Sequence, residues 1–288
     1  MDRMDLVGAS SGVASRLSFH EIQPDRAATS QMTAFTCALE RHTGRSFADY
    51  QALHDFSVRD YRTFWSFLLR WSEDIDWSGS AEPACIGDEC EHARFFPHVR
   101  LNYAEALLNL AVAPAHMPAL TVCHANGPTL HLTRGELRER VARLADALSA
   151  LGLGEGDRVI GVLRNDADAV VTALAVTALG ATLSTVAPEM SAETMLERFQ
   201  PLEPRFMFAH TAAQPFDIGV PVEANVAVLA AALPSLQHIV VLDGGSLPDR
   251  VKPTVHAMAD LIANGDAARF VWRQFPFNEP LFIMFSSG

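Results

Sequence analysis

The feature that most constrains this chain is a regular alternation of helical segments with short apolar runs in its second half. Helical periodicity covers Asp166 to Leu179 and Ser191 to Phe199, and the connections are short. A strand, helix, strand order of this kind predicts right-handed crossovers and a mainly parallel sheet with helices on both faces. The predicted strands are Val159–Leu163, Ala181–Val186, Arg205–Ala209 and His238–Leu242.

The first helix of this alternation has clear start and stop signals. Thr133 and Glu136 have the spacing of a capping box, in which each side chain bonds the backbone N–H of the other residue. Leu132 and Leu137 are placed to pack across that turn, and Gly152 ends the helix. One face of the helix is apolar, and it predicts burial against the sheet.

An uncharged stretch from Ala169 to Ala187 is long enough to raise the question of a membrane span. It is composed of Ala and Thr more than of Leu and Phe, Gly180 interrupts it, and Pro188 follows it. We therefore expect a buried helix, a glycine cap and a buried strand, and no membrane span.

The N-terminal part is organised differently. Residues 1–30 lack periodicity and are expected to form a loose arm, and residues 31–71 have a helical pattern rich in aromatic residues. An aromatic stripe at helical spacing favours packing against the larger domain over a ligand platform. Residues 72–95 carry Gly, Pro and acidic residues without a period, which predicts a connecting segment.

Charge and cysteine content exclude several classes of partner. The formal charge is −12 and Lys252 is the only lysine, so no basic surface for nucleic acid is expected. The first 19 residues lack the apolar core of a secretory signal, and the four cysteines are few, which predicts a cytoplasmic protein. Cys85, Cys90, His92 and His98 lack the paired spacing of a structural zinc site, so no metal site is predicted.

The last residues of the sequence are the best candidate for a ligand site. Leu281 to Phe285 is a continuous apolar run, typical of a strand covered on both faces, and Ser286, Ser287 and Gly288 follow it. A loop of such residues can turn backbone N–H groups toward an anion, although an ordinary surface turn has the same composition. No G-x-G-x-x-G follows the first strands, and the glycines from Gly152 to Gly156 are typical of a helix stop and a turn.

Several local strings of the sequence follow, in the same order, the motifs of one known enzyme family. Residues 96–105 (FPHVRLNYAE) are similar to the string W-F-P-x-x-x-L-N-Y-A-E, and residues 133–159 resemble a region with T-x-x-E-L and G-D-R-V. Residues 280–288 resemble a strand that enters the signature loop S-S-G-T-T-G-x-P-K, and residues 197–201 and 233–236 are further local matches. Together these strings resemble the acetoacetyl-CoA synthetases of the adenylate-forming acyl-CoA synthetase superfamily, whose N-terminal helical extension residues 46–54 and Phe64-Trp65 also resemble.

The resemblance implies an α/β fold with a mainly parallel sheet covered by helices. It divides the chain into an arm (1–30), a helical extension with its connecting segment (31–95) and a partial AMP-binding domain (96–288) that ends at the phosphate loop. The last part would be an incomplete first subdomain of the adenylate-forming large domain. Only Ser286, Ser287 and Gly288 match the ATP phosphate-binding loop, and no catalytic residue or metal ligand carries over.

The activity implied is ligation of acetoacetate to CoA. ATP and acetoacetate would form an acyl-adenylate and diphosphate, with Mg²⁺ as the metal ion, and the CoA thiol would then displace AMP. The loop's T-T-G-x-P-K remainder is not among the 288 residues, so this chain alone is expected to be inactive. Two departures stand out: Ser184 to Met190 differs from the family's S-S-T-S-P-D-F-G, and residues 209–222 contain no Lys or Arg that could approach CoA phosphates.

Two alternatives remain open from the sequence. The chain could come from a related ligase for acetate or propionate. It could also be a non-catalytic interaction module or one half of a split enzyme, with a separately encoded C-terminal half as its partner.

Overall fold

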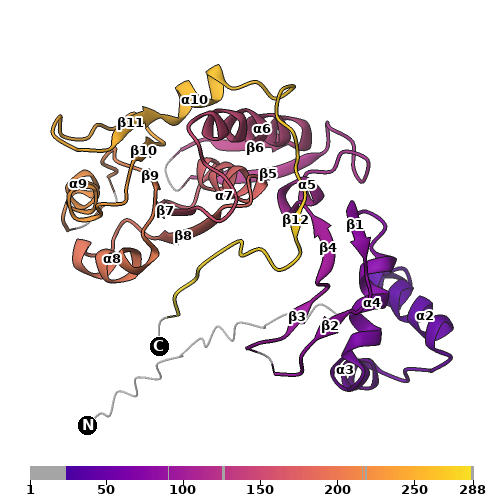
Figure 1. Ribbon diagram of the computed structural model, residues 1–288. Helices are drawn as coiled ribbons and strands as arrows, with labels where there is room; N and C mark the ends of the chain where they lie inside the picture. The colour runs from indigo at the N-terminus through magenta and orange to yellow at the C-terminus, as the bar shows by residue number, and fades with distance from the viewer. Residues whose placement is uncertain (1–23, 90, 125–126, 216, 218, 287–288) are drawn as a thin grey trace, which may run out of the picture. The chain divides into compact units, whose positions relative to one another are not determined.

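The chain divides into two compact units, and the boundary between them falls between Phe67 and Leu68. Figure 1 labels the helices and strands of the chain. A computed structural model describes residues 24–89, 91–124, 127–215, 217 and 219–286. The first unit consists of helices, and the second contains the sheet predicted from the sequence.

The helices of the first unit begin and end at the residues that the sequence favours. Ser30 accepts a hydrogen bond from the N–H of Thr33 at the start of α2 (3.1 Å), and Gly44 ends that helix with φ of 68°. The ring of Phe35 contacts that of Phe64, with the centroids 5.5 Å apart. The helices are α1 (Pro24–Ala28), α2 (Gln31–Thr43), α3 (Tyr50–Arg59) and the first part of α4 (Tyr61–Trp71).

A short helix, α1, lies within the range in which the sequence predicts a loose arm, residues 1–30. Residues 24–28 are helical and Ser30 caps the next helix, while residues 1–23 lie outside the described part of the chain. Five helical residues are too few to show a periodicity in sequence, so only the serine cap was available as a signal.

Three short strands lie within the connecting segment expected over residues 72–95. Strands β1 (Trp77–Ser80), β4 (His98–Leu101) and β12 (Phe275–Pro276) form an antiparallel sheet in the order β1-β4-β12. A second pair joins β2 (Cys85–Ile86) to β3 (Arg94–Phe95). Strands of two to four residues show no alternation that can be detected in sequence, and β12 is distant in sequence from its partner.

A capping box starts α6, as predicted. The N–H of Thr133 donates to Glu136 Oε2 (2.8 Å), and the N–H of Glu136 donates to Thr133 Oγ1 (3.2 Å). The preceding hairpin of β5 (Pro118–Cys123) and β6 (Thr129–Thr133) was not predicted. Helices α5 (Tyr103–Leu107) and α6 (Arg134–Ala150) flank this hairpin in sequence.

The second unit is built on a parallel sheet of five strands, which confirms the predicted fold class. The strand order is β11-β10-β9-β7-β8, and each neighbouring pair is parallel. The strands are β7 (Arg158–Val162), β8 (Thr182–Val186), β9 (Phe206–Ala209), β10 (His238–Val241) and β11 (Thr254–Ala257). The helices between and after them are α7 (Ala167–Ala178), α8 (Ala192–Phe199), the 3-10 turn η1 (Gln200–Leu202), α9 (Val222–Ala232) and α10 (Met258–Asn264).

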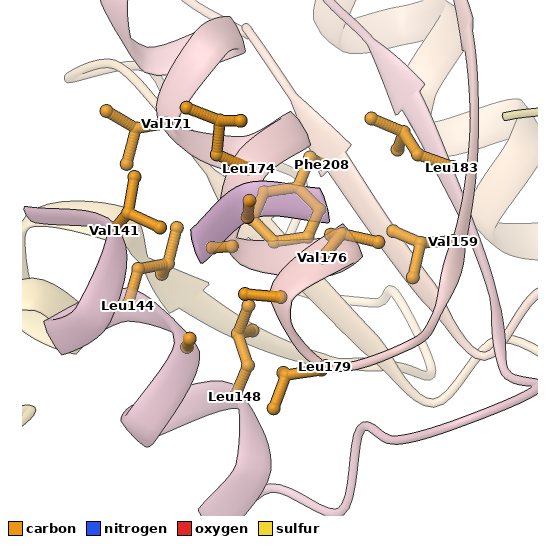
Figure 2. Close-up of a cluster of buried hydrophobic side chains, with 14 of the residues drawn as sticks. Val141, Leu144, Leu148, Val159, Val171, Leu174, Val176, Leu179, Leu183 and Phe208 are labelled. Atoms are coloured by element: carbon orange, nitrogen blue, oxygen red, sulfur yellow. The ribbon is translucent and has the colours of Figure 1, made fainter. Parts of the chain in front are cut away.

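Alternate residues of strands β7, β8, β9 and β10 enter two separate cores, one on each face of the sheet. In β9, Phe206 and Phe208 pack with residues of helices α6 and α7, and Met207 packs with residues of helices α8 and α9. Figure 2 shows the first core, where Phe208 and Val159 from the sheet lie among leucines and valines of α6 and α7. Burial on both faces explains why these strands read as continuous apolar runs.

The uncharged stretch from Ala169 to Ala187 divides as predicted into a helix, a glycine turn and a strand. Helix α7 ends at Ala178, Gly180 turns the chain with φ of 71°, and β8 begins at Thr182. Within the described ranges, no helix combines the length and the apolar character needed to cross a bilayer.

The C-terminal apolar run lies beside β8 but is not buried, so the expectation of a strand covered on both faces is wrong. Phe282 forms a single parallel bridge with Leu183, whose N–H donates to the carbonyl of Leu281 at 3.0 Å. Met284 is 88% exposed. Phe282 and Phe285 are exposed as well, so three of the five apolar side chains of this run are in contact with solvent.

Candidate ligand-binding site

The winding of the sheet reverses at β7. The chain leaves β7 through α7 and pairs β8 on one side, then returns through α8 and pairs β9 on the other side of β7. Helices α7 and α8 contribute to opposite cores, so they cover opposite faces. In open α/β sheets, ligands bind outside the carboxyl ends of the strands at such a reversal.

A cavity of about 700 Å³ opens at this edge of the sheet. Its walls come from the segments that directly follow β7, β8, β9 and β10, together with the end of the β5–β6 hairpin. The lining includes Arg164, Asp166, Asp168, Glu189, His210 and Asp243 among its polar residues, and Leu163, Ala187, Pro188, Pro215 and Leu242 among its apolar ones.

His210 and Asp166 form a buried hydrogen-bonded pair in the cavity wall. The Nε2 of His210 lies 2.7 Å from Asp166 Oδ2, and its Nδ1 accepts from the backbone N–H of Arg164 at 3.1 Å. Because Nδ1 accepts, Nε2 carries the hydrogen and donates to the carboxylate. Asp166 also caps α7 by accepting from the N–H of Ala169 at 2.9 Å.

Asp243 follows β10 and receives several hydrogen bonds from a neighbouring loop. The N–H groups of Thr211 and Ala212 both donate to it at 3.0 Å, and the N–H of Gly245 donates at 3.2 Å. A Cβ atom at Gly245 would overlap the backbone N of Ala212 and the hydroxyl of Thr211. Glycine is therefore required for the two loops to approach this closely.

Arg164 ties three of the loops together. Its Nη2 donates to Asp217 Oδ2 at 2.9 Å and to the carbonyl of Ala212 at 3.0 Å, and its Nη1 lies 3.4 Å from Asp243 Oδ2. The side chain is 12% exposed. Its Nε is buried without a hydrogen-bond partner in the described part of the structure. Arg164 thus neutralises two carboxylates and fixes the positions of the loops after β7, β9 and β10.

The carboxylates of the site differ in their tendency to ionise. Burial acts to raise the pKa of Asp166 and of Asp243, but hydrogen bonds from His210 and from backbone N–H groups outweigh it, so both pKa values lie below the ordinary range. Burial raises the pKa of Asp168 even though Arg140 donates to it at 2.7 Å. Asp166 and Asp243 are therefore ionised at neutral pH.

The predicted phosphate-loop residues are only partly described. Ser286 is exposed and is not among the described residues that line the cavity, while Ser287 and Gly288 lie outside the described part of the chain. The segment that leads to them runs parallel to β8, so it leaves the sheet at the same carboxyl edge as the cavity.

Both departures from the family pattern fall in the cavity wall. Ala187, Pro188 and Glu189 belong to the segment that replaces S-S-T-S-P-D-F-G, and His210, Gln214 and Pro215 belong to the segment without Lys or Arg. The two segments whose sequences differ from the family pattern therefore each form part of the cavity wall.

Arg164, His210 and Asp243 line the cavity but were not predicted from the sequence as site residues. A signal was present, because each of these polar residues follows within two residues of a predicted strand, where carboxyl-end loops bind ligands. The same rule predicts the site at Ser286, after the last apolar run.

No metal site emerges from the part of the chain that the structure describes. There, no cluster of three or more His, Cys, Asp and Glu side chains has an arrangement that could hold a metal ion. Cys85 is buried, and Cys90, the second cysteine of the weak zinc pattern, lies outside the described residues.

The sequence of this chain matches a known protein family and several known proteins. Residues 110–288, more than half of the chain, match the family described as AMP-binding enzyme. The chain is 35% identical over 271 residues to acetoacetyl-coenzyme A synthetase of Rhizobium meliloti (strain 1021) and 31% identical over 283 residues to acetoacetyl-CoA synthetase of Rattus norvegicus. Each alignment covers 92% of this chain and 41% of the relative.

The fold of this chain is also similar to that of a solved structure. The acetoacetyl-CoA synthetase from Streptomyces lividans superposes with a TM-score of 0.83 at 32% identity, over 92% of this chain and 41% of that one. The chain thus spans about 41% of the length of these relatives. The matched residues include the whole five-stranded sheet and the cavity at its carboxyl edge, and the chain therefore belongs to the AMP-binding enzyme family.

Proposed function

We propose that this chain is part of an acetoacetate–CoA ligase. The observation that carries the proposal is its likeness to acetoacetyl-CoA synthetases in sequence and in fold over 92% of its length. The complete ligase would convert ATP, acetoacetate and CoA to acetoacetyl-CoA, AMP and diphosphate through an acyl-adenylate. This chain would supply the sheet and one wall of the substrate site.

We further propose that Ser286, Ser287 and Gly288 begin the loop that binds the ATP phosphates. The support is positional, since the segment before them pairs with β8 in parallel and leads to the carboxyl edge of the sheet. Backbone N–H groups of a Ser/Gly loop can hold phosphate oxygens, as the leaving diphosphate requires. Mg²⁺ is not assigned to any residue, because the described residues provide no cluster of metal ligands.

Arg164, Asp166, His210 and Asp243 are assigned a positioning role. Their hydrogen bonds are made to one another and to the backbone of neighbouring loops, so they hold the rim of the site in one arrangement. We also propose a cytoplasmic location, which is supported by the free thiols of Cys37 and Cys123.

The proposal is tested by restoring the rest of a ligase. Residues 1–288 are joined to the remainder of the Streptomyces lividans acetoacetyl-CoA synthetase, and exchange of labelled diphosphate into ATP is measured with different acids. We expect acetoacetate to support exchange better than acetate or propionate, and we expect no exchange from the 288-residue chain alone. Preference for acetate or propionate would assign the chain to a related ligase instead.

A further inference from the structure

The cavity has two positions at which a parallel α/β sheet usually binds phosphate. One is the N-terminus of the helix that follows the first strand, where free N–H groups and the helix dipole favour an anion. The other is a turn whose successive N–H groups converge on one point. Both positions are present at this edge of the sheet, and their occupants can be identified.

A carboxylate of the chain already occupies the first position. Helix α7 has 12 residues, and Asp166 accepts from the N–H of Ala169 at its N-terminus. The second oxygen of Asp166 lies 2.7 Å from His210 Nε2. A phosphate could bind here only by displacing a carboxylate that is hydrogen-bonded through both of its oxygens.

The second position is filled in the same way. The N–H groups of Thr211, Ala212 and Gly245 converge on Asp243, as they would on a phosphate oxygen. The guanidinium of Arg164, the one Arg or Lys side chain among the described lining residues, is paired with Asp243 and Asp217. The cationic group that would attract a phosphate is therefore already neutralised.

The remaining charges oppose an anion as well. The described lining contains the carboxyl side chains of Asp166, Asp168, Glu189 and Asp243 and one guanidinium, and Asp168 is paired with Arg140 outside the lining. Glu189 is exposed, so a phosphate that entered the cavity would meet a free carboxylate. At the separations found within a cavity, such repulsion is only partly screened by salt.

We infer that this cavity is closed to phosphate by its own carboxylates, Asp166 and Asp243, and that it receives a phosphate-free part of a ligand. The phosphates of the cosubstrates named above must then be held elsewhere on the complete protein. The inference does not depend on which acid the ligase uses, because it rests only on the geometry and charge of the cavity.

Binding of inorganic diphosphate tests the inference directly on the 288-residue chain. The amide resonances of Thr211, Ala212 and Gly245 are followed by NMR during a titration up to about 10 mM. We expect no saturable shift in the wild type. In the Asp243→Ala variant, the freed N–H groups and Arg164 should bind diphosphate at least about tenfold more tightly than the wild type does.

Asp249→Ala is the matched control, since Asp249 is an exposed aspartate in the same segment after β10 and does not line the cavity. It makes the same change in net charge and should behave as the wild type does. A saturable shift of the three amides in the wild type, with a dissociation constant below about 1 mM, would overturn the inference.

A folded Asp243→Ala variant that gains no diphosphate binding would also overturn it. If the Asp243→Ala spectrum loses its dispersion, Asp243→Asn replaces it, because the amide keeps the shape and one acceptor while removing the charge. The wild-type titration remains decisive in either case. Neither result alters the substrate preference measured by diphosphate exchange, so the two proposals fail separately.

Discussion

Arg164 and Asp243 form an ion pair, Nη1 to Oδ2 at 3.4 Å, between loops that follow two non-adjacent strands of the sheet. Strand β9 lies between β7 and β10, and Arg164 also bonds the carbonyl of Ala212 in the loop that follows β9. One side chain therefore spans three consecutive strand ends. The cavity keeps its shape because these loops are joined to one another as well as to their strands.

Replacing Arg164 with methionine should destabilise the protein by about 2–3 kcal/mol. The substitution leaves Asp217 and Asp243 without their cationic partner in a setting where the guanidinium is only 12% exposed, and removal of one partner from a buried pair costs more than a surface pair contributes. Urea unfolding measures the change. Arg250→Met, at an exposed arginine, is the control and should lie within about 0.5 kcal/mol of the wild type. Equal effects of the two substitutions would contradict the assigned role.

Two adjacent glycines give a matched test of the close approach of the loops. A Cβ at Gly245 would overlap the backbone of Ala212, whereas no atom lies within 4 Å of a Cβ built at Gly244. Gly245→Ala should therefore cost about 1–3 kcal/mol, and Gly244→Ala should be near neutral or slightly stabilising. Thermal unfolding of both variants decides the point, and a Gly245→Ala protein as stable as the wild type would show that the loops can separate freely.

The parallel sheet could be predicted because its signals are local. Runs such as Val159 to Val162 are buried on both faces, and Thr133, Asp166 and Ser191 mark helix starts with caps that need only the next three residues. The antiparallel sheet could not be predicted, since Phe275 pairs with Leu101 across a long sequence separation and its strand has only two residues. The C-terminal run was expected to be buried, but its exposure depends on what lies beside it, which local composition does not encode.

For the candidate site, too, the features with local sequence signals could be predicted, and those that depend on contacts between distant segments could not. The sequence predicts that ligand-binding groups lie at the carboxyl ends of strands, and the cavity lies at that edge of the sheet. Ser286 remains a prediction, as do Ser287 and Gly288, which lie outside the described residues. The network of Arg164, His210 and Asp243 could not be deduced in detail, because its bonds depend on how four loops meet in space.

A histidine pair at the edge of the sheet predicts a loss of stability in acid. His238 Nδ1 lies 3.1 Å from His256 Nε2, and His238 stacks on Phe206. Burial lowers the pKa of both rings below 6.5, and the charges of His256 and Arg205 lower the pKa of His238 further. The unfolded chain therefore binds more protons than the folded chain as the pH falls below about 6.5, so the free energy of unfolding decreases over that window.

His256→Gln tests this pH dependence, since glutamine keeps a hydrogen-bonding group and does not titrate. Urea unfolding of both proteins between pH 5 and pH 8 gives the comparison. The stability of the wild type relative to the variant should be greatest above pH 6.5 and should fall by several tenths of a kcal/mol or more toward pH 5, because a tenfold difference in proton affinity between the folded and unfolded chains corresponds to about 1.4 kcal/mol. A difference that does not change with pH would show that the pair does not titrate with folding.

Substitutions at Asp166 separate its two contacts. Its carboxylate caps α7 through the N–H of Ala169 and accepts from His210, whose ring is buried. Asp166→Ser keeps a capping oxygen but is too short to replace the bond to the ring, whereas Asp166→Ala loses both contacts. A lost cap costs about 1 kcal/mol, and a buried imidazole N–H without an acceptor costs about 1–3 kcal/mol. Denaturant unfolding should therefore rank the proteins as wild type, then serine, then alanine; equal stability of serine and wild type would show that the bond to His210 contributes nothing.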